Sequence, residues 1–131
     1  MDPIRKARLE SLMIEELTLL INGGIKDPRV GQVTITKIEL TPDAKEAKIY
    51  FVPFGVSADP ESDESRETAD DCLEGLRNSK GFLKRQLGPI LKTRNIPDLF
   101  FKEDLGYYNT SRVNELLKQI DSEKAREPDN E

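Results

Sequence analysis

Lysine and arginine gather in the segment Arg77–Leu87, RNSKGFLKRQL, which carries four basic residues and no acidic one. Ammonium and guanidinium groups bind phosphate oxygens, so such a block is typical of a surface that holds a polyanion. Gly81 adds room, because a backbone without a Cβ lets a sugar–phosphate chain approach closely. The candidate contact residues in and beyond this segment are Ser79, Lys80, Gly81, Lys84, Arg85, Lys92 and Arg94.

The overall charge of the chain hides this block. The formal net charge is −5, yet residues 72–102 hold seven basic and two acidic groups, while residues 57–71 hold one basic and seven acidic groups. A partner responds to the local potential rather than to the total charge. The sequence therefore predicts a cationic surface between acidic segments, with a merely solvated helix face as the alternative.

The residues that most often carry catalysis are missing or badly placed. The chain has no histidine, and its single cysteine, Cys72, falls on an apolar helical stripe and is expected in the core. Asp70 and Asp71 are adjacent, so on a helix they point in different directions and cannot act as a pair. We expect no enzyme, no cofactor and no metal site. Tyr107-Tyr108 could stack on bases, but packing onto the core explains them equally well.

A second, smaller set of cations lies in the N-terminal part of the chain. Three of them lie close together on the predicted N-terminal helix, where a role in solubility is favoured over RNA contact. The other two flank Asp27-Pro28, a sequence typical of a turn. The candidates for secondary contacts are Arg5, Lys6, Arg8, Lys26 and Arg29.

The sequence predicts that the N-terminal half forms one helix followed by a hairpin. Asp2-Pro3 is typical of a helix start, and the helix is expected to run to Asn22 before Gly23-Gly24. Two strands follow at 32–40 and 47–52, joined by a short turn and therefore antiparallel. In the first strand the apolar alternation slips, which predicts a bulge or strand end near Thr36-Lys37. In the second, Ala47, Ile49 and Phe51 should face the helices.

The sequence predicts that the C-terminal half forms two helices, a strand and a last helix. A helix through 69–76 is followed, after the turn at 78–81, by a helix from Phe82 toward Lys92 that Gly88-Pro89 should bend or interrupt. One half of its helical wheel is apolar, and Arg85 and Lys92 lie on the other half. A strand is expected at 99–104, and a helix capped by Thr110 or Ser111. Residues 122–131 are expected to be a disordered acidic tail.

This order of elements predicts an α+β domain over residues 1–121, with helices covering one face of a three-stranded sheet. Two helices joined by a tight turn of small residues, in the order α-β-β-α-α-β, are the type II KH arrangement for binding single-stranded nucleic acid. The sequence contains no apolar run long enough to cross a bilayer and no signal-peptide pattern, so a cytoplasmic protein is expected. No long apolar stripe is left over for a dimer, so we expect a monomer.

Five stretches of the sequence resemble a known protein family. IKDPRVGQVTIT, IELTPDAKEAKIYF, NSKGFLKRQL, IPDLFF and NELLKQI together resemble the bacterial ribosome-binding factor A family over about residues 4–120. The resemblance implies a KH-like fold and binding to the free or immature small ribosomal subunit and its ribosomal RNA, with support for RNA maturation, no catalytic step and a role in cold adaptation. Family members have an alanine-x-glycine kink between the two helices, where this chain has Ser79-Lys80-Gly81, so serine replaces alanine.

Two other classes of function stay open from the residues. A protein-binding adaptor that uses the other face of the sheet or the acidic segments is the first alternative. A hydrolase or nuclease is the second, although the chain has no phosphate-binding loop pattern and no nucleophile with a recognisable base.

Overall fold

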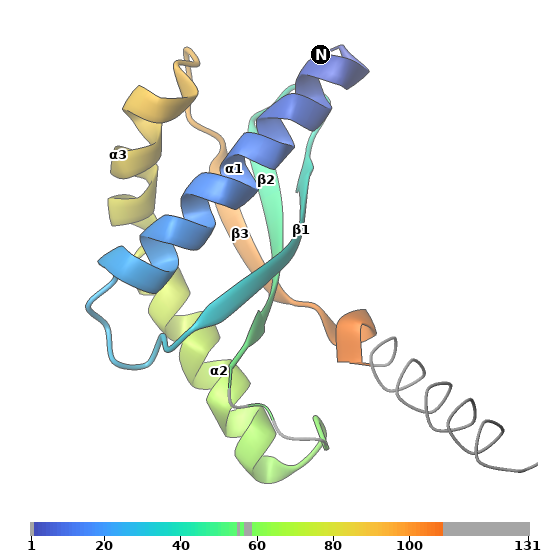
Figure 1. Ribbon diagram of the computed structural model, residues 1–131, viewed down its shortest axis with the longest axis vertical. Helices are drawn as coiled ribbons and strands as arrows, with labels where there is room; N and C mark the ends of the chain where they lie inside the picture. The colour runs from blue at the N-terminus through green and yellow to red at the C-terminus, as the bar shows by residue number, and fades with distance from the viewer. Residues whose placement is uncertain (1, 55, 57–58, 109–131) are drawn as a thin grey trace, which may run out of the picture.

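The computed structural model describes residues 2–54, 56 and 59–108 (Figure 1). Its elements are α1 (Pro3–Gly24), β1 (Val33–Leu40), β2 (Glu46–Pro53), α2 (Asp63–Asn78), α3 (Lys80–Leu91) and β3 (Asp98–Glu103). This order confirms the predicted α-β-β-α-α-β domain. The predicted helix from Thr110 or Ser111, the boundary at 121 and the tail 122–131 lie outside the described residues.

Helix α1 starts and ends close to the predicted residues. The Asp2 side chain accepts a hydrogen bond from the backbone N–H of Ile4 at 3.2 Å, and Pro3 occupies the first turn, where its missing N–H costs nothing. Met13, Leu17 and Ile21 are buried along one side of the helix. Spacings of four residues thus place one apolar stripe of α1 on the core.

The three strands form one mixed sheet in the order β1-β2-β3. β1 and β2 are an antiparallel hairpin, and the register shifts between Ile35 and Lys37, so Thr36 is the extra residue of a bulge. This confirms the irregularity that the slipped alternation predicts, and the bulge returns Ile38 and Leu40 to the core face. β3 runs parallel to β2 at the other edge.

The core lies between one face of the sheet and the helices (Figure 1). α1 packs on β1 and α3, whereas α2 packs on β2 and β3. As predicted, Ala47, Ile49 and Phe51 of the central strand face this layer and are fully buried. The opposite face of the sheet is left open by all three helices.

Helix α3 differs from the sequence expectation at its start and at Pro89. It begins at Lys80 rather than at Phe82, and it runs through Pro89 to Leu91 without the expected interruption. Pro89 cannot donate a hydrogen bond to the Arg85 carbonyl, but only Ile90 and Leu91 follow it in the helix. Leu87 and Leu91 are buried on either side of it, and their packing holds the last turn in place.

Two polar side chains of α1 hold the outer edge of β1. Asn22 accepts from the backbone N–H of Val33 at 2.8 Å and donates its amide to the Val33 carbonyl at 3.0 Å. Glu10 accepts from the backbone N–H of Leu40 at 2.9 Å. These bonds satisfy backbone groups at both ends of an edge strand, which would otherwise invite pairing with another chain.

The turn after α1 docks on a glycine of α2. Arg29 pairs through two nitrogens with Asp27, at 3.0 and 2.7 Å, and contacts Glu74 of α2 at 3.2 Å. Val30 then packs so closely on Gly75 that a Cβ at that position would clash with the Val30 side chain. Gly75 lies within the last turn of α2, and this contact explains the glycine there.

Candidate nucleic-acid interface

A single residue, Ser79, joins α2 to α3. Its backbone N–H donates to the carbonyl oxygens of Gly75 and Leu76, both at 3.1 Å, and its carbonyl accepts from Leu83 at 3.0 Å. The predicted turn over residues 78–81 is thus too long, because α3 starts directly after Ser79. The first turn of a helix presents backbone N–H groups without an acceptor inside the helix, and here it carries Lys80 and Gly81.

Two of the predicted contact residues bend toward β3. The Lys80 ammonium lies 2.8 Å from Oδ1 of Asp98, and the Lys84 ammonium lies 3.6 Å from the same oxygen. The hydrogen bond from Lys80 holds the pKa of the Asp98 carboxyl below its usual range, and the charge of Lys84 adds to this. Both lysines therefore share one counter-ion, a pairing that the sequence did not predict because Asp98 lies in another element.

The remaining predicted cations of this region point into solvent. Arg85, Lys92 and Arg94 are exposed, and none forms an ion pair with another described residue. Along α3, Lys80 and Lys92 are separated by roughly 18 Å at the usual helical rise. The predicted residues therefore form an elongated basic ridge, defined here as Lys80, Lys84, Arg85, Lys92 and Arg94, and do not converge on one point.

The backbone at two positions bears on this ridge. Gly81 is exposed, and a Cβ placed there would meet only the Arg85 side chain at an ordinary 3.6 Å, so the space above the first turn of α3 is open. Lys92 ends α3 in the left-handed region, with φ of 53°, a conformation that favours glycine. A lysine is held at this position despite a backbone cost of about 1 kcal/mol.

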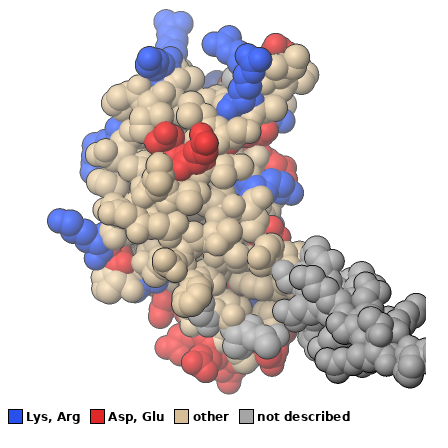
Figure 2. All heavy atoms as spheres, in the orientation of Figure 1, with Lys and Arg blue, Asp and Glu red and all other residues tan. Residues whose placement is uncertain are grey.

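The two signs of charge separate in part on the helical side of the molecule (Figure 2). Lysine and arginine side chains project from the upper end and along the side occupied by α3. Aspartate and glutamate gather at the lower end, over the first turns of α2, and a smaller acidic group lies in the upper middle of this view. Asp63 and Glu64 lie in that first turn. The segregation predicted from the segment charges is thus present on the folded surface.

The second set of predicted cations divides between two places. Arg5, Lys6 and Arg8 lie on the first turns of α1, at the same end of the molecule as the end of α3 (Figure 1). Lys26 is exposed at the other end of α1. Arg29 is engaged with Asp27 and Glu74, so its guanidinium fastens the turn to α2.

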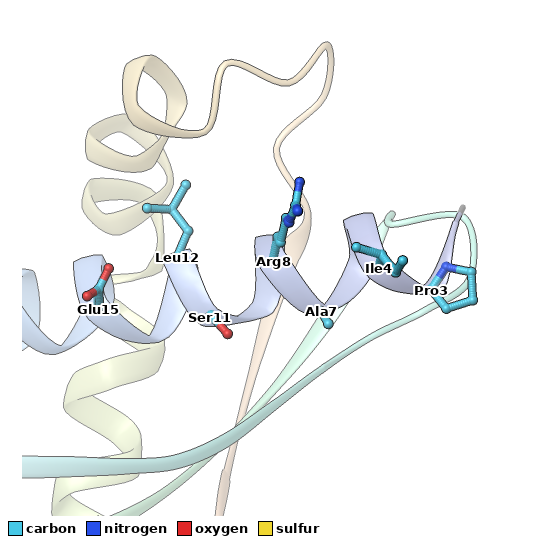
Figure 3. A pocket seen from close by; sticks show the side chains of 7 residues that line it. All are labelled: Pro3, Ile4, Ala7, Arg8, Ser11, Leu12 and Glu15. Carbon is cyan, nitrogen blue, oxygen red and sulfur yellow. The ribbon is translucent and has the colours of Figure 1, made fainter.

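A groove on the outer side of α1 has no catalytic character. It is open, has a volume of about 560 Å³ (Figure 3), and is lined by Pro3, Ile4, Ala7, Arg8, Ser11, Leu12 and Glu15. All of these residues come from one helix and follow its three- and four-residue spacing. The groove offers no converging set of polar groups of the kind that binds and orients a small substrate.

The other candidates for chemistry are structural. Cys72 is buried, and burial raises the pKa of its thiol to about 11, which makes it unreactive at neutral pH. Asp70 and Asp71 are exposed, and the described residues hold no cluster of three or more histidine, cysteine, aspartate or glutamate side chains that could bind a metal. None of the helices described is long and apolar enough to span a membrane.

Tyr108, at the end of the described residues, belongs to a polar cluster, whereas Tyr107 is exposed. The Tyr108 hydroxyl donates to Oε2 of Glu103 at 2.7 Å, and Arg66 of α2 contacts both oxygens of that carboxylate at 2.9 and 3.1 Å. Burial, together with this carboxylate, raises the pKa of Tyr108 well above its usual range. The cluster ties the end of β3 to α2, which favours packing over base stacking for Tyr108.

Comparison with known proteins agrees with this geometry. The profile of the family "Ribosome-binding factor A" matches residues 5–117. Ribosome-binding factor A of Thermomicrobium roseum is 36% identical over 127 residues, covering 97% of this chain and 92% of that protein. The chain belongs to the ribosome-binding factor A family. Its counterpart in Brevibacillus brevis is also 36% identical, over 94% of each chain.

Solved structures of ribosome-binding factor A share the fold. The crystal structure from Thermus thermophilus superposes with a TM-score of 0.61 at 22% identity, over 75% of this chain and 93% of that chain. The solution structure of a Thermotoga maritima protein described as a putative ribosome-binding factor A gives a TM-score of 0.55 at 26% identity, over 81% of this chain and 93% of that one. A homology model of the Thermus protein has been fitted into the cryo-EM map of a 30S complex, and its TM-score is 0.55 at 23% identity, over 75% of this chain and 93% of that chain.

Proposed function

We propose that this protein is a non-enzymatic assembly factor that binds the free or immature small ribosomal subunit in the cytoplasm and assists the maturation of its ribosomal RNA. The observation that carries the proposal is its membership of the ribosome-binding factor A family over residues 5–117. The Thermus relative, fitted into the map of a 30S complex, supports the choice of subunit. The protein is expected to act as a monomer.

The proposed contact surface is the basic ridge of α3 together with Ser79 and Gly81 at the helix joint. Exposed Arg85, Lys92 and Arg94 are available to phosphates, and the open space above Gly81 would admit a sugar–phosphate backbone. Arg5, Lys6 and Arg8 extend the same end of the molecule and are proposed as secondary contacts. Lys26 is a weaker candidate, and Arg29 is the weakest because it is already paired.

Salt dependence is the signature of this mechanism. Each phosphate neutralised by a lysine or arginine releases counter-ions, so binding should weaken steeply as salt is raised. Cosedimentation with immature small subunits at low and high salt tests this directly. Association that is absent at every salt concentration would refute the proposal and favour an adaptor for an unrelated protein.

Charge reversal tests the surface. The double variant R85E/K92E should release the protein from immature subunits with little change in melting temperature, because both side chains are exposed. The comparison variant E15K/E16K on α1 changes the net charge by the same amount in the opposite direction at an exposed and a half-buried position, and it should not release the protein. Unchanged subunit binding by R85E/K92E would contradict the assignment of the ridge.

A further inference from the structure

The face of the sheet that the helices leave open carries two aromatic rings among lysines. Tyr50 and Phe100 occupy the strand positions that alternate with the buried ones, so both lie on this face. In the register of β2 and β3, Lys48 is opposite Phe100, and Tyr50 is opposite Lys102. Aromatic and basic residues therefore alternate across the two strands. We call Lys48, Tyr50, Phe100 and Lys102 the sheet platform.

Each ring of the sheet platform has an ammonium group above it. Lys37 of β1 places its nitrogen 4.6 Å from the centre of the Tyr50 ring, and Lys80 of α3 places its nitrogen 4.8 Å from the centre of the Phe100 ring. Such contacts are attractive because the ring face is electron-rich. Lys48 and Lys102 are exposed and have no ion pair among the described residues.

Acidic groups flank the sheet platform at both ends of the face. Glu39 pairs with Lys37 at 2.9 Å and is opposite Lys48 in the register, and Asp98, opposite Glu46, holds Lys80. Asp104 lies at the other end, where its Oδ2 accepts from the Thr36 hydroxyl at 2.6 Å. Between these groups, the nearest neighbours of the two rings across β2 and β3 are Lys48 and Lys102.

The sheet platform is continuous with the basic ridge through one residue. Lys80 belongs to the first turn of α3, yet its ammonium contacts both Asp98 and the Phe100 ring at the edge of the sheet. A strand of RNA that leaves the joint of α2 and α3 can therefore pass around β3 onto the open face. For a base to stack on Tyr50 or Phe100, the ammonium group above that ring must move aside, which is a movement of a lysine side chain.

We propose that the sheet platform binds single-stranded RNA, with unpaired bases stacked on Phe100 and Tyr50 and phosphates on Lys48 and Lys102. The inference rests on the proposed function and adds a second contact surface to it. Every base has a π face, so rings set among cations suit unpaired RNA of any sequence. A protein partner fits less well, because the centre of a protein interface is depleted of lysine, whereas here lysines separate the two rings.

Tryptophan substitution gives a direct readout, because the chain contains no tryptophan. F100W places the fluorophore on the sheet platform, and the control F54W places it at another exposed phenylalanine; Phe100 is 44% exposed and Phe54 is 78% exposed. Phe54 lies just beyond the end of β2, roughly 13 Å along the strand from Tyr50 and roughly 20 Å from Lys48. Adding a short single-stranded oligoadenylate should quench the indole fluorescence of F100W and leave that of F54W unchanged. Equal emission from F100W with and without saturating RNA would overturn the inference.

Affinity measurements with the same oligonucleotide separate stacking from apolar contact. F100A and F100L should both weaken binding by roughly five- to 150-fold, whereas F100Y should bind like the wild type. Melting temperatures should change little, since the ring is far from fully buried. Wild-type affinity in F100A, or in F100L, would show that no base stacks on this ring.

The outcomes distinguish this inference from the proposed function. If R85E/K92E loses RNA binding but F100A retains it, the sheet platform is refuted and the function of the ridge stands. If F100A binds oligoadenylate normally yet fails to cosediment with small subunits, the platform contacts a ribosomal protein and the inference is wrong. If the wild-type protein binds no RNA, both proposals fall.

Discussion

Asp98 restrains two lysines of the basic ridge, and its replacement by asparagine should strengthen RNA binding. Lys80 and Lys84 approach the same oxygen at 2.8 and 3.6 Å, so one negative charge offsets two positive ones. D98N removes that charge but keeps an oxygen that can accept from the backbone N–H of Leu99, which lies at 3.1 Å. The variant should therefore fold normally, at a cost of less than about 1 kcal/mol for an exposed ion pair.

The size of the effect follows from the charge removed. Two unit charges about 4 Å apart in a watery environment interact by about 1 kcal/mol, so removing the repulsion between Asp98 and a bound phosphate should raise affinity about fivefold at low salt. One freed lysine can neutralise one more phosphate. The plot of log K against log salt should then become steeper by about 0.7 for single-stranded RNA.

The assay is equilibrium binding of single-stranded oligoadenylate over a series of salt concentrations. The matched control is D70N, which changes the net charge by the same amount at an exposed position of α2. If D98N and D70N have the same affinity and the same salt slope, then Asp98 does not hold the lysines away from RNA and the reasoning is refuted.

Three further predictions concern stability. G75A should destabilise the protein by about 1–3 kcal/mol in urea unfolding, because its methyl group would clash with Val30, and a wild-type midpoint would show that the turn can move aside. N22A should cost about 1 kcal/mol, since it removes the hydrogen-bond partner of both backbone groups of Val33; an unchanged midpoint would mean that water replaces the amide fully. Hydrogen bonds from Arg29 lower the pKa of Asp27 from 3.8 to about 2, so the stability it contributes is complete above pH 3.8 and is lost as the pH falls toward 2. D27N should therefore flatten the fall of the urea midpoint in that pH range, and an unchanged slope would contradict this.

Most of the fold could be predicted because local rules and burial agreed. Asp2-Pro3 marks a helix start by its own chemistry, and the slip between Ile35 and Ile38 in the alternation of β1 predicts a bulge or a strand end, of which the structure has the bulge at Thr36. The parallel direction of β3 was not predicted, because the order of elements alone does not fix the direction of a strand that follows two helices. The predicted interruption at Pro89 was wrong, because the buried side chains of Leu87 and Leu91 keep the last turn of α3 helical.

The placement of the candidate residues on the fold could be predicted in outline, whereas their contacts could not. Charge segregation could be predicted from the charges counted along the chain, and the exposed side of α3 could be predicted from helical periodicity. The pairing of Lys80 with Asp98 could not be read, since it joins α3 to β3 and depends on how the helix lies across the sheet edge. The sheet platform was missed for the same reason: Tyr50 and Phe100 become neighbours only through the β2–β3 register.

Crosslinking on immature small subunits tests the central claim most directly. Photo-crosslinks between ribosomal RNA and the protein, mapped to residues on the protein side, should fall on α3 and the joint at Ser79. They should be sparse on the first turns of α2, where Asp63 and Glu64 repel phosphate. Crosslinks confined to α2, or contacts with ribosomal proteins alone, would show that the basic ridge is not the RNA-binding surface.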